Sequence, residues 1–81
     1  MAGTCNGFRN WETWNVWVWI TNDAFLYNNC VNYIQTHLDP TYTGFISSMG
    51  LQGQCTPDGA PYDGDMIDVI RLDTLVAELL D

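Results

Sequence analysis

Four tryptophans lie within nine consecutive residues of this 81-residue chain, in a segment with few polar side chains. Wound as a helix, residues 10–21 would be apolar nearly all round, with Asn15 as the main polar interruption. Such a helix must be buried on most sides or covered by a partner. The residue types also suit a strand, and every second residue from 14 to 20 is apolar: Trp14, Val16, Val18 and Ile20.

Two later segments have the three- and four-residue periodicity of amphipathic helices. The first begins at the capping pair Asn22 and Asp23 and is stopped by Pro40; the second begins at Asp68, its expected cap. A short helix over residues 41–50, ended by Gly50, is also indicated, and residues 51–65 hold closely spaced turn formers.

The residue types of residues 14–20 favour a strand, and the family resemblance described below favours a helix there. With that resemblance we predict an all-α fold, a small single-domain bundle of about three helices with an Asp-rich loop before the last helix. An α+β fold with residues 14–20 as a strand is the alternative. Residues 1–9 are expected to form a short N-terminal arm, and residues 10–81 a single compact domain.

The charge of the chain restricts its partners. Ten acidic residues oppose two arginines, Arg9 and Arg71, and the formal net charge is −8. Direct binding to nucleic acid or to an anionic membrane needs clustered basic residues, so neither is expected. With no basic leader and no apolar run long enough to span a bilayer, a cytoplasmic location is expected.

The residue types that commonly take part in catalysis or metal binding form no recognisable motif in this sequence. Cys5, Cys30 and Cys55 are odd in number and widely spaced, which favours reduced thiols, although one pair stays open. Cys30 falls in an apolar helical stripe and is expected in the core. His37 has no Ser or Cys at a suggestive spacing, and the aspartates depart from the calcium-loop pattern at three positions. We expect no enzymatic activity, no cofactor and no metal.

One segment carries a resemblance to a known family. It reads Asn10-Trp-Glu-Thr-Trp-Asn-Val, then Trp19-Ile-Thr-Asn-Asp, then Leu26-Tyr27. It resembles the hallmark of a small domain of unknown function that recurs in bacteriophages and mobile elements, strongly over residues 10–27 and loosely over residues 57–80. The resemblance implies a phage-type origin and a compact, largely helical domain. Position 17, often alanine in that family, is Trp17 here, which makes it a candidate interface anchor.

The polar residues of this segment also have a purely local interpretation. Asn10 or Thr13 would cap the helix, and Glu12 would favour the positive end of its dipole. Asn15 would satisfy a neighbouring backbone group.

The acidic residues suggest a function class. Seven of the ten lie in residues 58–81 with one arginine, a net charge of −6. We expect a phage-type protein that binds and modulates, most simply inhibits, a host protein with a basic surface, such as a polymerase, nuclease or defence effector. At the extreme the acidic face would mimic DNA. The expected contact residues are Asp58, Asp63, Asp65 and Asp68, with Trp17 as apolar anchor.

The alternative is a self-assembling structural or virion accessory protein. A helix that is apolar all round is readily covered by a second copy of the chain, so a homodimer is possible. The acidic charge would then serve only solubility.

Overall fold

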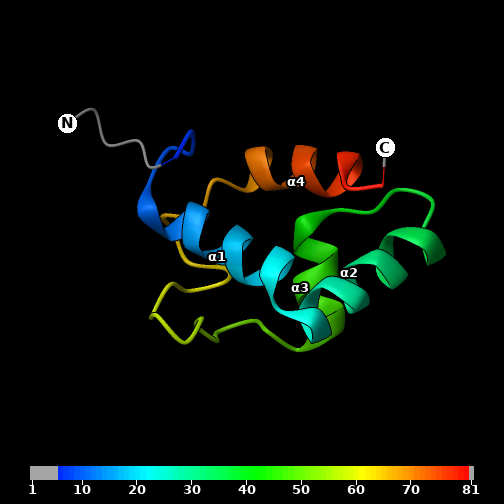
Figure 1. Cartoon of the computed structure of the whole chain (residues 1–81), viewed down its shortest axis with the longest axis horizontal. Helices are drawn as coiled ribbons and strands as arrows, with labels where there is room; N and C mark the ends of the chain where they lie inside the picture. Colours follow the sequence, from blue (N-terminus) through cyan, green and yellow to red (C-terminus); the bar gives the residue numbers. More distant parts are fainter. Residues whose placement is uncertain (1–5, 81) are drawn as a thin grey trace.

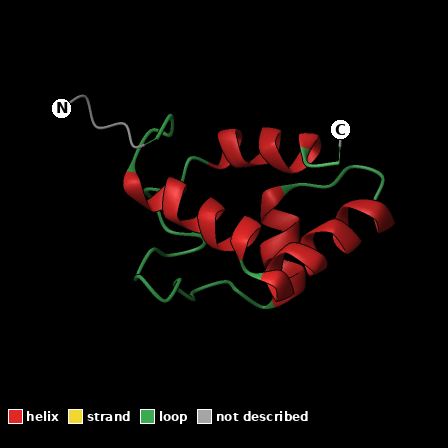
Figure 2. Ribbon diagram, in the orientation of Figure 1, coloured by secondary structure: helices red, strands yellow, loops and turns green. Residues whose placement is uncertain are grey.

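The computed structural model describes residues 6–80, which form four helices and connecting loops (Figure 1). The helices are α1 (Trp11–Asn22), α2 (Ala24–Thr36), α3 (Tyr42–Met49) and α4 (Val69–Glu78). The predicted all-α fold is confirmed, and the short segment before Gly50 brings the number of helices from about three to four. Residues 14–20 are helical, so the strand alternative is wrong, and no strand is drawn among the described residues (Figure 2). An isolated bridge joins Cys55 to Pro61.

Each helix begins at a side chain that accepts a hydrogen bond from a backbone N–H of the first turn. Asn10, Asp23 and Asp68 do this as the sequence predicts, with donor–acceptor distances of 2.9, 3.0 and 3.2 Å. Thr41 caps α3 in the same way. Gly50 ends α3 with φ = 69°, a left-handed conformation that glycine adopts without the steric cost of a Cβ.

As a helix capped by Asn10, the tryptophan segment satisfies most of its own backbone hydrogen bonds. Its apolar surface is divided among several neighbours. Val16 and Ile20 are fully buried in the core, and Trp14 and Trp17 pack against that core while remaining partly exposed. Helix α2 lies beside α1, and α4 crosses the opposite side of the molecule (Figure 1).

The remaining core lies where α2, α3 and α4 meet. Its central side chains are fully buried and apolar, with Cys30 among them as predicted: Cys30, Phe45, Leu72 and Val76. Burial raises the pKa of the Cys30 thiol to about 11, so this cysteine stays protonated.

The predicted N-terminal arm contributes to this core. Phe8 is buried in it, and the Arg71 guanidinium lies 5.4 Å from the centre of the Phe8 ring. Residues 1–5, with Cys5, lie outside the described residues.

Candidate functional site

The segment between α3 and α4, residues 51–68, is called the acidic loop here, and it carries all four predicted contact aspartates. Its centre is a tight turn in which the Thr56 amide donates to the Ala60 carbonyl (2.8 Å) and the Gly59 amide donates to the Thr56 carbonyl (2.8 Å). The turn needs glycine at position 59, where φ is 96°. The loop therefore has a defined shape of its own.

The turn is held against α1 by four side chains, which we call the clasp: Asn15, Trp19, Thr56 and Asp58. Asn15 Nδ2 and Trp19 Nε1 both donate to Asp58 Oδ2, over 3.0 and 2.9 Å. Thr56 Oγ1 donates to Asn15 Oδ1 over 2.6 Å. Residues 15 and 19 are one helical turn apart, so both face the loop from the same side of α1.

The structure corrects the local interpretation of Asn15. Its amide bonds to loop side chains that lie 41 and 43 residues away in sequence, not to a neighbouring backbone group. Asn15 and Thr56 are almost fully buried, at 3% and 4% exposure. A buried polar side chain must find its partners inside the protein, and here each supplies one for the other.

The loop is also attached at its far end. Asn10 Nδ2 donates to the Met66 carbonyl (2.6 Å), and the Asp68 amide donates to Thr13 Oγ1 (2.9 Å). Asn10 and Thr13 thus start α1 and at the same time fix the end of the loop. Between the two attachments, the buried Tyr42 hydroxyl of α3 donates to the carbonyl of Tyr62. The loop is consequently fastened to both α1 and α3.

Asp58 is the aspartate whose ionisation the clasp affects. Its side chain is exposed, and the hydrogen bonds from Asn15 and then Trp19 hold the pKa of its carboxyl below the ordinary value of 3.8. Donors aimed at a carboxylate favour its charged form. Asp58 is therefore anionic at neutral pH, with Oδ2 occupied and no hydrogen bond to Oδ1 from any described residue.

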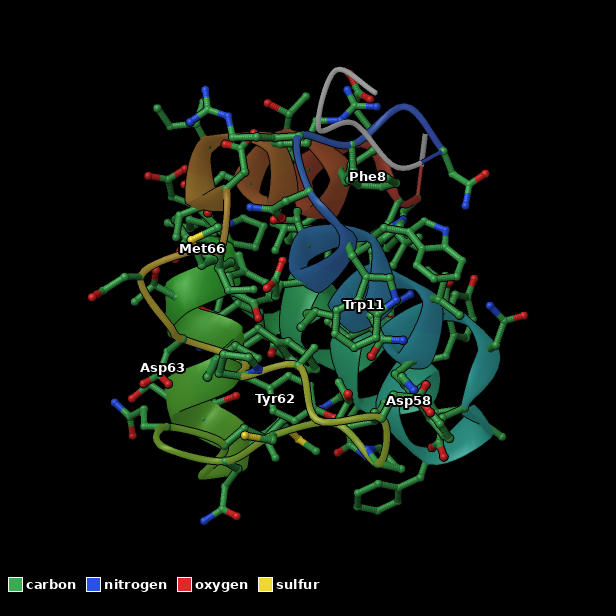
Figure 3. The ribbon with its side chains drawn as sticks, turned by 90° about the vertical axis from the view of Figure 1, so that its left-hand side faces the viewer. Phe8, Trp11, Asp58, Tyr62, Asp63 and Met66 are labelled. Atoms are coloured by element: carbon green, nitrogen blue, oxygen red, sulfur yellow. The ribbon has the colours of Figure 1, made fainter. Side chains whose placement is uncertain are left out.

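The other three predicted contact aspartates differ in their surroundings. Asp63 is exposed and accepts from the Gly53 amide (3.0 Å), while Asp65 is exposed and bonds to no described residue. Asp68 caps α4, and its Oδ2 lies 3.8 Å from Arg9 Nε. In Figure 3, Asp58 and Asp63 lie on opposite sides of one face of the molecule, with Tyr62 between them. The structure therefore spreads the acidic residues along a surface.

The tryptophans divide into two pairs. Trp14 and Trp17 pack against the core and remain partly exposed, so Trp17 stays a prediction as the apolar anchor. Trp11, with 40% exposure, and Trp19 lie outside that cluster, on the side of α1 that carries Asn15 (Figure 3 shows Trp11 above the loop). The spacing of 11, 15 and 19 is the signal that could have separated this stripe from the core side.

Within the described residues there is no pocket and no group of three side chains suited to hold a metal ion. No helix in this part of the chain is long and apolar enough to cross a membrane.

Fold and site together define a small all-α domain with an acidic loop fastened to its first helix. The chain belongs to a family of unknown function (DUF7249), whose model matches residues 1–81. Comparisons with curated proteins and with solved structures found no match.

Proposed function

We propose that this chain is a phage-type protein that binds the basic surface of a host protein and thereby inhibits it. The partner class is a host enzyme that handles nucleic acid, such as a polymerase, nuclease or defence effector, in the bacterial cytoplasm. Basic clefts of such enzymes accept phosphates, and carboxylates held on a rigid surface take the place of phosphates. The activity is therefore contact with a protein, without chemistry of its own.

The observation that carries the proposal is the fastened acidic loop. Its attachments to α1 and α3 display the exposed carboxylates of Asp58, Asp63 and Asp65 in a fixed arrangement. A preorganised surface loses little conformational entropy on binding, which favours affinity. The chain has only two arginines to offset its ten acidic residues, so the field around this loop attracts basic surfaces.

We infer that the loop aspartates differ in how readily a partner would reach them. Asp63 and Asp65 are the most available aspartates, because Asp68 is engaged with the α4 cap and lies near Arg9. Trp11 is better exposed than Trp17 and is the aromatic neighbour that a partner would reach first.

The test uses the tagged full chain to capture proteins from bacterial lysate at low and high salt. The double variant Asp63→Lys/Asp65→Lys reverses two charges without touching the clasp. Its matched control, Asp39→Lys/Glu78→Lys, reverses two exposed charges outside the loop. We expect one salt-sensitive partner from the nucleic-acid machinery, lost with the loop variant and kept with the control, while circular dichroism stays helical.

Equal losses for both variants would show that only net charge matters, and unchanged binding of the loop variant would refute the acidic-surface proposal.

Self-assembly is the second candidate, and a separate observation favours it. Ile70 and Met66 are 81% and 56% exposed, and Trp11 adds a third uncovered apolar side chain. Apolar surface of this kind is commonly covered by a partner or a second copy. Size-exclusion chromatography with light scattering separates the two candidates: a monomer supports the first, and a dimer that Ile70→Ser dissociates supports the second.

A further inference from the structure

We propose that Asp58 and the indole of Trp19 form a receptor for one arginine side chain of the partner protein. The inference rests on the proposed function and names the group that this part of the surface recognises. It concerns a single carboxylate with a defined geometry, separate from the general attraction of the acidic loop for basic surfaces.

The geometry leaves half of the carboxylate open. Oδ2 of Asp58 receives the two N–H groups of the clasp, at 3.0 Å from Asn15 Nδ2 and 2.9 Å from Trp19 Nε1. Oδ1 receives no hydrogen bond from the described residues, and the side chain is exposed. The two donors to Oδ2 fix the orientation of the carboxylate. The lone pairs of Oδ1 therefore point in a defined direction, toward solvent or a partner.

No cation among the described residues 6–80 lies beside the charge of Asp58. Both arginines are placed elsewhere: Arg9 lies against Asp68, at 3.8 Å, and Arg71 lies over the Phe8 ring. The two clasp donors are neutral, so they hold the carboxylate without neutralising it. Asp58 is thus an ionised acceptor without a counter-ion among the described residues, which leaves it open to a cation of a partner.

The indole beside this carboxylate supplies a second attraction. Trp19 lies outside the core cluster and is partly exposed, and its N–H edge points at Asp58. Tryptophan is the best aromatic partner for a cation over its face, and a hydrogen bond to an anion further polarises the ring. A guanidinium can stack on a ring while its N–H groups reach a carboxylate, whereas a lysine ammonium is compact and strongly hydrated. This combination selects arginine over lysine.

The experiment compares an arginine-rich and a lysine-rich peptide of equal length and charge, each titrated into the full chain by calorimetry. We expect the arginine peptide to bind about fivefold more tightly, the gain typical of one exposed ion pair with a cation–π contact. Asp58→Asn removes the charge but keeps an amide oxygen for the clasp donors, and should abolish the preference. The control Asp65→Asn makes the same charge change on an aspartate with no partner, and should weaken both peptides equally.

A second readout follows the site directly. In ¹⁵N–¹H spectra, the arginine peptide should shift the side-chain N–H signal of Trp19, while that of Trp14, packed against the core, stays in place. A clasp with only a structural role would leave the Trp19 signal unmoved by peptide.

The outcomes separate the two proposals. Equal affinity for both peptides, or identical effects of the two asparagine variants, would overturn the arginine receptor and leave the acidic-surface proposal standing. Absence of binding by either peptide would also overturn the receptor, and the lysate experiment then judges the proposed function independently.

Discussion

The helical region formed by α2, α3 and α4 and the clasp region formed by α1 and the acidic loop share one apolar core, but the clasp region also depends on hydrogen bonds between distant side chains. The first is a cluster of buried apolar side chains such as Phe45, Leu72 and Val76. The second joins segments about 40 residues apart through hydrogen bonds between side chains, with Asn15 and Thr56 buried at its centre.

The two regions should therefore respond differently to substitution. In the apolar region, removing atoms loses burial and leaves a cavity, so the damage follows the volume removed. In the clasp, removing one partner leaves the other buried and unsatisfied, so an almost isosteric change is already harmful. Apolar burial thus stabilises both regions, since the core includes Val16 of α1 and Tyr62 of the loop, and the hydrogen bonds of the clasp further fix the position of the loop turn.

Phe45→Ala should have the largest effect, because this side chain is completely buried. The expected loss is about 3–5 kcal/mol in the free energy of unfolding, comparable with the whole stability of a domain of this size. Urea unfolding followed by circular dichroism measures it. The matched control is Phe25→Ala, in which the same side chain is 68% exposed and the free energy should hardly change. Similar losses at both positions would contradict the placement of the core.

Thr56→Val should have an intermediate effect, about 1–3 kcal/mol, because it keeps the shape of the side chain and removes its hydroxyl. That hydroxyl donates to Asn15 Oδ1 and accepts from the Ala60 amide. Hydrogen exchange should show faster exchange at Ala60, with the amides of α4 less affected. In the control Thr74→Val, the lost hydroxyl is exposed and bonds only to its own helix. If the clasp does not stabilise the fold, Thr56→Val and Thr74→Val should lose the same free energy of unfolding.

Acidification should have the smallest effect on the clasp, where it acts through the carboxyl of Asp58. The folded-state pKa of Asp58 is depressed by the donors Asn15 and Trp19, so its ionised form stabilises the folded state. This contribution is present above the ordinary pKa of 3.8 and is lost as the pH falls through the lower folded value. The Trp19 side-chain N–H signal should therefore titrate with a midpoint below 3.8. In Asp58→Asn this titration should vanish, and a midpoint at or above the ordinary value would show that the clasp does not form.

The starts of α1, α2 and α4 are largely predictable from sequence, because helix caps are local signals. Asn10, Asp23 and Asp68 precede apolar periodic segments, and each caps the helix that follows. The core position of Cys30 is predicted by helical periodicity, which is a local signal, and it is confirmed. The helix end at Gly50 is predicted by the preference of glycine for a left-handed conformation, and it is confirmed as well.

The candidate site was predictable only in part. The aspartates of the loop could be recognised as a charged segment, but which of them are engaged could not. Asp58 belongs to the clasp because the loop passes beside α1 at that point. Asp65 is exposed and forms no hydrogen bond with a described residue. Trp17 drew attention as a departure from the family pattern, yet the rotation of α1 turns it to the core and leaves Trp11 more exposed.

The sequence by itself determined that the chain is strongly acidic and where its later helices begin, because caps, periodicity and charge are local or additive properties. It left residues 14–20 open between helix and strand, and the tertiary structure decided for the helix. Only the tertiary structure decided the role of Asn15, whose partners Thr56 and Asp58 lie more than 40 residues further along the chain. A hydrogen bond between distant side chains forms only when packing brings donor and acceptor within about 3 Å of each other. The sequence around each residue does not predict that contact.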